Sequence, residues 1–180
     1  MYDVRHKCGK NPLCYDILGS ITTYLNRPEV QRKIKVIPTR YQGCNMSVNL
    51  FFGTTGDWMK PFQGFVSNLL NAGVSTLIYA GDADFICNWL GNRAWTLKLP
   101  WAGKSAFNSV KERPWVDAAS REATGVAREY HAPSGARHGN FTFLRVFGAG
   151  HMVPYDQPES SLDMVNRWMQ GQSFTTLPAA

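Results

Sequence analysis

Residues 75–84, STLIYAGDAD, and residues 141–151, FTFLRVFGAGH, are built in the same way. Each begins with a short run of apolar and β-branched residues, passes through glycine and ends at a titratable side chain. Continuous apolar runs of this length are typical of strands that are covered on both faces of a parallel sheet. The sequence therefore predicts two buried parallel strands, at 75–80 and 141–147, that lead into polar loops.

Four other segments have the three- and four-residue apolar spacing of amphipathic helices. They are residues 15–25, 62–70, 88–97 and 158–170. Gly73 and Gly171 are expected to end the second and the fourth of these helices. We expect loop with short extended pieces at 36–50, and the polar stretch 103–139 has little periodicity.

Helices and buried strands alternate along the chain, which indicates an α/β layer architecture. A sheet usually contains about four to six strands, and only two are predicted here. The chain is therefore interpreted as part of a larger fold.

The composition is that of a globular protein, with 44% hydrophobic and 18% charged residues in a chain of 180. The formal net charge is +6, but the 19 Lys and Arg residues are scattered, so no nucleic-acid partner is expected. No run approaches the roughly 18 apolar residues of a membrane span. The first residues also lack the basic-then-apolar order of a signal peptide. We expect neither a membrane contact nor a signal peptide.

Four cysteines and two sequons bear on the cellular compartment. Cys8 and Cys14 flank a turn-rich loop that could bring them to disulfide distance, although spacing alone does not establish the bond. A zinc site is the alternative, but CxxC and paired-histidine spacings are absent from the sequence, and no metal is expected. Asn45 and Asn140 begin Asn-X-Ser/Thr sequons and are candidate glycosylation sites in a secretory context.

The chemistry is expected in the loops that follow the two strands, because ligands of open α/β sheets bind beyond the carboxyl ends of strands. A carboxylate that accepts a hydrogen bond from one imidazole nitrogen makes the other nitrogen a general base. His151 follows the second strand, and Asp82 and Asp84 both qualify by position after the first. The order Asp then His is the second half of the Ser, Asp, His order of α/β-hydrolases. A turn-stabilising aspartate is the alternative interpretation of either acid.

Several extended motifs resemble those of the serine carboxypeptidases, in particular the carboxypeptidase Y-like group. Residues 79–92, YAGDADFICNWLGN, resemble the aspartate region of that family, and residues 147–158, FGAGHMVPYDQP, resemble its histidine region. Residues 56–61, GDWMKP, and 13–15, LCY, also match. The resemblance implies the C-terminal portion of an α/β-hydrolase fold, and a serine-type peptidase that acts on the C-termini of peptides or proteins without a cofactor.

The resemblance assigns Asp84 to the triad aspartate and His151 to the general base. A Gly-X-Ser-X-Gly nucleophile elbow is absent from the 180 residues. In the family this serine lies in the N-terminal half, so that half, from the same gene or a partner chain, is the expected partner. A truncated sequence, the second chain of a processed enzyme, a degenerate paralogue and a non-catalytic partner-binding chain are the open alternatives.

The resemblance also implies a substrate pocket and a compartment. Cys87 and Met152 would line the pocket for the last residue of the substrate, and Trp58 and Ile86 the wall for the penultimate one. Ordinary packing is the alternative for the pocket residues.

The cysteines of the N-terminal region match the family as well. Cys8 and Cys14 match a local family disulfide, and Cys44 matches a cysteine whose partner lies far upstream. The implied location is vacuolar, lysosome-like or secreted. Residues 1–45 would be a remnant of the cap insertion and a linker, and 46–180 part of the hydrolase core.

Overall fold

The computed structural model describes residues 2–9, 15–118 and 120–176. The chain divides into two compact units. The larger unit comprises Met1–Arg5 and Phe62–Ala180, and the smaller unit comprises His6–Pro61. The first residues of the chain therefore belong to the unit that contains both predicted strands. The assignment of 1–45 to a cap insertion stays a prediction.

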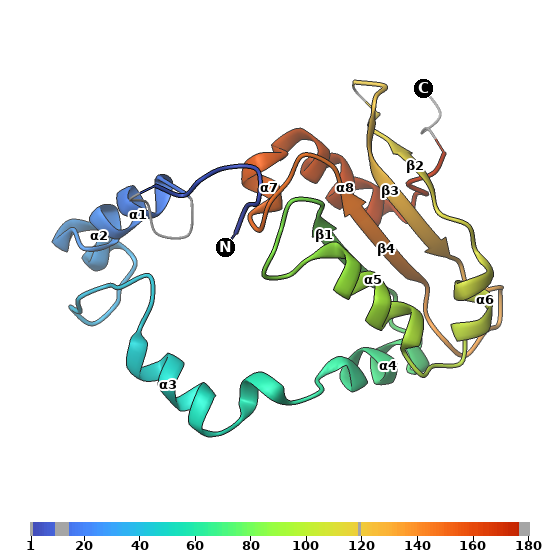
Figure 1. The fold of residues 1–180 in the computed structure, drawn as a ribbon, viewed down its shortest axis with the longest axis horizontal. Coiled ribbons are helices and arrows are strands. Elements are labelled where there is room, and N and C mark those ends of the chain that lie inside the picture. Colours follow the sequence, from blue (N-terminus) through green and yellow to red (C-terminus); the bar gives the residue numbers. More distant parts are fainter. Residues whose placement is uncertain (1, 10–14, 119, 177–180) are drawn as a thin grey trace. The chain divides into compact units, whose positions relative to one another are not determined.

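A four-stranded sheet forms the centre of the larger unit (Figure 1). Its strands, in the order β1-β4-β3-β2, are β1 (Thr76–Gly81), β4 (Phe141–Val146), β3 (Ala123–Tyr130) and β2 (Arg113–Val116). β1 and β4 are parallel, with Ile78 opposite Phe143, and β3 is antiparallel to both of its neighbours. The two predicted strands are thus confirmed as parallel neighbours.

β2 and β3 lie in the stretch 103–139, where the sequence predicts no strand. β3 combines exposed, partly buried and buried positions and includes the charged Arg128 and Glu129. β2 is four residues long and contains Pro114. Neither strand has a continuous apolar run, so their conformation depends on pairing with distant residues rather than on a local pattern.

Two apolar clusters cover the opposite faces of the sheet. Phe141 and Phe143 of β4 belong to one cluster, and Leu144 and Val146 belong to the other. Successive side chains of a strand point to opposite faces, so β4 is covered on both sides, as its apolar run predicts. β1 is less covered, and Tyr79 on it is 42% exposed.

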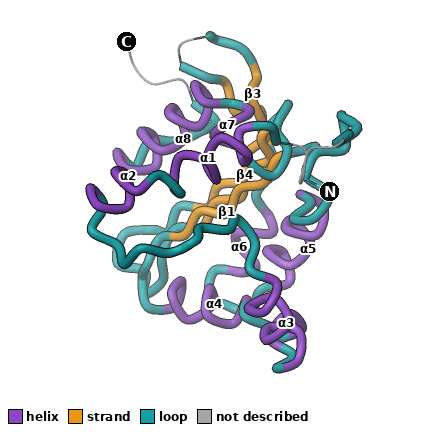
Figure 2. Tube along the Cα trace, turned by 90° about the vertical axis from the view of Figure 1, so that its left-hand side faces the viewer, coloured by secondary structure: helices purple, strands orange, loops and turns teal. Residues whose placement is uncertain are grey.

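Helices flank both faces of the sheet. Figure 2 shows α4, α5 and α6 on one side of the strands and α7 and α8 on the other. Gly73 and Gly171, which follow α4 and α8, have positive φ angles of 87° and 65°, as expected of helix stops. The bounds of these helices are α4 (Gln63–Asn71), α5 (Trp89–Lys98), α6 (Lys104–Ser109), α7 (Val153–Asp156) and α8 (Pro158–Gln170).

The smaller unit contains α1 (Ile17–Leu25), α2 (Pro28–Lys33), α3 (Met46–Thr54) and the 3₁₀ helix η2 (Asp57–Met59). The predicted first helix is confirmed, but the expectation of loop through residue 50 is wrong, because α3 begins at Met46. The side chain of Asn45 caps this helix by accepting hydrogen bonds from the backbone N–H groups of Ser47 and Val48. No residue of α3 is buried, which explains the missing amphipathic pattern.

No helix in the described part of the chain combines the length and the apolar character that crossing a bilayer requires.

Candidate active site

The loops after β1 and β4 lie side by side because parallel neighbours end at the same edge of a sheet. The backbone N–H of Asp82 donates to the carbonyl of Val146, and that of Ala83 donates to the carbonyl of Ala149, both at 2.9 Å. These bonds extend the pairing of the two strands into the loops.

Two glycines permit this close approach. A Cβ atom on Gly81 would lie 2.3 Å from the carbonyl oxygen of Ala149 and 2.4 Å from that of Gly150. Gly148 has a φ of +66°, a left-handed conformation that favours glycine. Each apolar run thus ends at a glycine that the geometry requires. Gly81 allows a close backbone contact, and Gly148 allows a left-handed turn.

The loops bring the side chains of Asp84 and His151 into contact. Nδ1 of His151 lies 2.9 Å from Oδ2 of Asp84, a normal hydrogen-bond distance. Oδ1 of Asp84 accepts a second hydrogen bond, from the backbone N–H of Cys87 at 3.1 Å. The Asp84 side chain is 4% exposed and that of His151 is 32% exposed. The acid is therefore held from two sides within the protein, and the imidazole reaches the surface.

This arrangement determines which nitrogen of His151 can act as a base. A carboxylate only accepts hydrogen bonds, so the bond to Asp84 requires the proton on Nδ1. Nε2 is then left with its lone pair and can take a proton from another group, while Asp84 stabilises the imidazolium that results.

Asp82, the other acid that qualified by position, has a different environment. Its Oδ1 accepts a hydrogen bond from the backbone N–H of Gly148 at 3.0 Å, and its Oδ2 lies 3.8 Å from a guanidinium nitrogen of Arg145. Asp82 therefore joins the two loops, whereas Asp84 contacts His151. Position in the sequence alone did not separate these two roles.

Residues at the beginning of the chain, which carry no sequence motif of a site, also contact the two loops. The backbone N–H of Val4 donates to the carbonyl of Ala83 at 3.0 Å, and that of His151 donates to the carbonyl of Tyr2 at 2.8 Å. The Tyr2 ring lies 4.1 Å from the imidazole, centroid to centroid. This segment has no periodic pattern, and its contacts lie far away in sequence, so no local signal reveals it.

Three of the four predicted pocket residues lie in the same two loops as the dyad. Cys87 and Ile86 are exposed, and Met152, partly buried, follows His151 directly. Partial burial and the nearby Asp84 carboxylate raise the pKa of the Cys87 thiol. Trp58 belongs to the smaller unit, where it is 65% exposed and makes an edge contact with Phe52. Its role as a pocket wall stays a prediction.

The same loops contain a set of metal-ligating groups. One donor atom each of Asp84, Cys87 and His151 lie within 4.8 Å of one another. Zinc accepts all three kinds of ligand. Asp84 and His151 already use the facing atoms in their mutual hydrogen bond, so a metal ion here would compete with the dyad.

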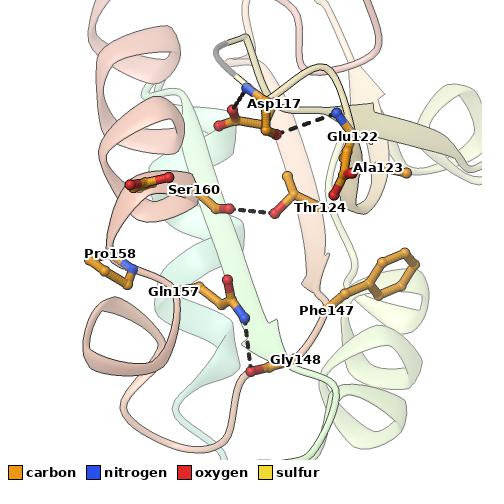
Figure 3. A pocket seen from close by; sticks show the side chains of 11 residues that line it. Asp117, Glu122, Ala123, Thr124, Phe147, Gly148, Gln157, Pro158 and Ser160 are labelled. Atoms are coloured by element: carbon orange, nitrogen blue, oxygen red, sulfur yellow. Dashed lines mark hydrogen bonds between the residues drawn. The ribbon is translucent and has the colours of Figure 1, made fainter.

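A cavity of about 400 Å³ borders the histidine loop (Figure 3). The carbonyl of Gly148 accepts a hydrogen bond from the Gln157 side chain at 3.1 Å, and the hydroxyls of Thr124 and Ser160 are hydrogen-bonded to each other. The lining of this cavity includes neither Asp84 nor His151.

The remaining predicted residues lie outside the two loops that contain the dyad. Cys44 is an exposed free thiol. Cys14 lies outside the described residues, so the disulfide with Cys8 stays a prediction. The side-chain oxygen of Asn45 caps α3, and that of Asn140 accepts from the backbone N–H of Ala132 at 2.9 Å. Glycosylation of either asparagine likewise stays a prediction.

Comparison with known proteins identifies the family. The family model described as serine carboxypeptidase matches residues 3–171. Carboxypeptidase Y of Candida albicans is 48% identical over 171 residues, which are 95% of this chain and 30% of that protein. Carboxypeptidase Y of Saccharomyces cerevisiae is 44% identical over 171 residues, with 95% and 31% covered. The chain thus spans about three-tenths of the length of these relatives.

A solved structure shows the same fold. The crystal structure of Kex1(delta)p, a prohormone-processing carboxypeptidase from Saccharomyces cerevisiae, superimposes with a TM-score of 0.73 at 24% identity. The match covers 95% of this chain and 36% of the other. The larger unit is accordingly a partial α/β-hydrolase fold, and the chain belongs to the serine carboxypeptidase family.

Proposed function

We propose that this chain supplies the aspartate and the histidine of a serine carboxypeptidase that removes C-terminal residues from peptides. The observation that carries the proposal is the 2.9 Å hydrogen bond between the buried carboxylate of Asp84 and the partly exposed imidazole of His151. The nucleophilic serine comes from the rest of the protein, because the 180 residues contain no Gly-X-Ser-X-Gly elbow.

The dyad acts as a proton relay in this proposal. The serine oxygen attacks the scissile carbonyl carbon as its proton moves to Nε2 of His151, and Asp84 stabilises the imidazolium. His151 then gives the proton to the leaving amino nitrogen as the C–N bond breaks. Water attacks the acyl-enzyme through the same relay and releases the shortened peptide. Protein groups suffice for each of these steps.

The expected partner is the remaining part of a carboxypeptidase. Its docking is supported by surfaces that a complete enzyme would cover. β1 pairs only with β4 among the described strands, so its other edge is open. On α8, Leu162, Val165 and Met169 are 63%, 51% and 78% exposed and are spaced along one side of the helix. The chain also spans about 30% of the length of its relatives.

The pocket residues suit an apolar C-terminal side chain. Ile86, Cys87 and Met152 combine an aliphatic, a thiol and a thioether group next to the dyad, and Trp58 is assigned to the same pocket by the family resemblance. The exposed Cys44 is the candidate for a disulfide to the missing half. A vacuolar or secreted location follows as part of the proposal, since disulfides form in oxidising compartments.

Reconstitution tests the proposal. The chain is co-expressed with the N-terminal portion of a relative such as carboxypeptidase Y of Candida albicans, and hydrolysis of a blocked dipeptide is measured. His151→Ala should abolish nearly all activity, whereas His131→Ala, at an exposed position outside the two loops, should leave it unchanged. A His151→Ala enzyme as fast as the wild type would refute the assignment.

The two aspartates give a sharper comparison. Asp84→Asn retains the shape of the side chain but favours the wrong imidazole tautomer, so kcat should fall by a factor on the order of 10³–10⁴. Asp82→Asn should reduce kcat much less, because Asp82 contacts Gly148 and Arg145 but not His151. Equal losses in both variants would contradict the distinct role given to Asp84.

A second candidate is a partner-binding chain without catalysis, which the open edge of β1 favours. A fluorophosphonate probe distinguishes the two. The reconstituted enzyme should be labelled on the serine of the other half, and the chain alone should stay unlabelled. Labelling of the chain alone would show that the nucleophile lies within it, and an unlabelled, inactive complex would favour the second candidate.

A further inference from the structure

The segment Tyr2–Arg5 is bound to both loops of the candidate site at once. The backbone N–H of Val4 donates to the carbonyl of Ala83, the residue before Asp84. The carbonyl of Tyr2 accepts from the backbone N–H of His151. The segment is therefore hydrogen-bonded to the backbone of His151 itself and to the backbone of Ala83, the neighbour of Asp84.

Arg5 links the same segment to the glycine turn that precedes His151. One terminal guanidinium nitrogen donates to the carbonyl of Gly148. The Nε atom donates to both carboxylate oxygens of Asp3, at 3.0 and 3.1 Å, and the other terminal nitrogen also contacts Asp3. Asp3 is 4% exposed, so the guanidinium of Arg5 is bound to a buried acid. The paired hydrogen bonds to the carboxylate fix the orientation of the guanidinium.

Asp156, in α7, contacts both the glycine turn and Arg5. Its Oδ2 accepts a hydrogen bond from the backbone N–H of Gly150 at 2.6 Å and lies 3.4 Å from a guanidinium nitrogen of Arg5. Gly148 and Gly150 are thus fixed by charged side chains. A glycine-rich turn has many accessible conformations, and charge-assisted bonds at both glycines select one of them.

The neighbouring carboxylates favour the charged form of the Arg5 guanidinium. The hydrogen bond to Asp3 raises the pKa of Arg5, against an opposing effect of burial, and the charges of Asp3, Asp156 and Asp82 raise it further. An arginine guanidinium is protonated at neutral pH in any case, and these contacts favour its charged form further.

The ring of Tyr2 adds a steric contact. It lies against the imidazole of His151 with the centroids 4.1 Å apart and the ring planes 30° from parallel. An aromatic ring at this distance covers one face of the imidazole and restricts its rotation about the side-chain bonds.

We propose that Arg5 and Asp156 are positioning residues which, together with the Tyr2 backbone and ring, hold His151 at the angle that its hydrogen bond to Asp84 requires. Neither residue touches the reacting atoms. They act through the turn from Gly148 to Gly150, whose conformation sets the direction of the next residue. The inference rests on the proposed function only where the dyad is called catalytic. The hydrogen bond between His151 and Asp84 can be measured in this chain without any substrate.

The test reads the dyad directly in the full chain. The Nδ1 proton shared by His151 and Asp84 should give a strongly downfield proton NMR signal that disappears in Asp84→Asn. In Arg5→Ala this signal should broaden or vanish, and exchange of the His151 backbone N–H with solvent should accelerate by about tenfold or more. Arg137→Ala, which replaces an exposed arginine of a loop, should change neither.

Chemical rescue separates positioning from general stability. Methylguanidinium at low concentration should restore the downfield signal of Arg5→Ala by filling the vacated place beside Asp3 and Gly148. Sodium chloride at the same ionic strength should not restore it. If Arg5→Ala unfolds the chain, Asp156→Asn provides the same test, because it removes the contact with Arg5 and weakens the bond to Gly150 but keeps the size of the side chain.

Two results would overturn the inference. One is a folded Arg5→Ala or Asp156→Asn chain with an unchanged downfield signal and unchanged exchange at His151. The other is rescue of Arg5→Ala by sodium chloride alone. Failure of the reconstituted enzyme to hydrolyse peptides would contradict the proposed function but would leave these NMR measurements, and hence the inference, unaffected.

Discussion

Gly81 and Ala149 approach so closely that a single methyl group on Gly81 would lie 2.3 Å from the carbonyl oxygen of Ala149. The obstructing atoms belong to the backbone, which cannot swing aside as a flexible side chain can. The distance between the aspartate loop and the histidine loop is therefore set by the absence of a side chain at this position.

Gly81→Ala should separate the two loops. We expect a loss of about 1–3 kcal/mol in the free energy of unfolding, measured by urea denaturation, and a weaker downfield signal of the dyad. Gly64→Ala is the matched control. Gly64 lies within α4 with nothing near its missing Cβ, so alanine there should stabilise the chain by about 0.5–1 kcal/mol. Equal stability of the Gly81→Ala and wild-type chains would contradict the close contact.

Cys87 should react slowly with iodoacetamide at neutral pH, because burial and Asp84 raise its thiol pKa above the ordinary value of 9.0. Mass spectrometry of the Cys87 peptide should show a higher alkylation midpoint in the native chain than in urea. Asp84→Asn should lower the native midpoint, since it removes the neighbouring charge.

The same shift has a consequence for stability. The folded chain keeps the Cys87 proton at pH values where the unfolded chain releases it. The free energy of unfolding should therefore fall as the pH rises above 9.0 toward the folded pKa, and Cys87→Ser should reduce this slope. A slope that is unaffected by the substitution would argue against a raised pKa.

Glu112 should contribute to stability at neutral pH and lose this contribution in acid. Burial alone would raise its pKa, but the hydrogen bonds from Arg93 and Arg128 outweigh that effect and lower it below 4.5. The contribution is thus present above pH 4.5 and is lost as the pH falls through the folded pKa. Glu112→Gln should cost about 1–2 kcal/mol at pH 7 in urea denaturation. The difference from the wild type should shrink toward pH 3, and a constant difference would refute the lowered pKa.

The exposed apolar residues of α8 should matter for assembly and not for the chain alone. The triple variant Leu162→Gln, Val165→Gln and Met169→Gln should unfold within about 0.5 kcal/mol per substitution of the wild type, because these side chains are exposed. The yield of active enzyme on co-expression with the N-terminal portion should fall severalfold. Ile37→Gln, at an apolar residue of the smaller unit that is 86% exposed, is the control and should assemble normally. An unchanged yield for the triple variant would exclude α8 from the docking surface.

The parts of the fold that could be predicted are those with a local cause. The apolar runs of β1 and β4 and the proline and glycine at the ends of α8 act within a few residues, and they mark these elements closely. β3 has no such signal, because its conformation is stabilised by pairing with β4. α3 buries none of its residues, so its pattern is not amphipathic.

The residues of the candidate site also differ in whether a local sequence signal reveals them. The contact between Asp84 and His151 could be predicted because each residue follows a recognisable strand and because the surrounding motifs are long. Arg5 could not, since its contact with Gly148 joins residues 143 positions apart and depends on a backbone carbonyl rather than on a particular side chain. Position in the sequence does not distinguish Asp82 from Asp84, since both follow β1 directly; the contact with His151 and the family resemblance do.

The parallel pairing of β1 with β4 also bears on the order of events during folding. Asp84 and His151 are 67 residues apart, and the intervening chain contains α5, α6, β2 and β3. Contacts between such distant residues form late, because closing a long loop costs entropy before any contact compensates for it. The pair of Asp84 and His151 should thus form only after most of the larger unit has its final topology, so partly folded chains would lack the dyad on which the proposed peptidase activity depends.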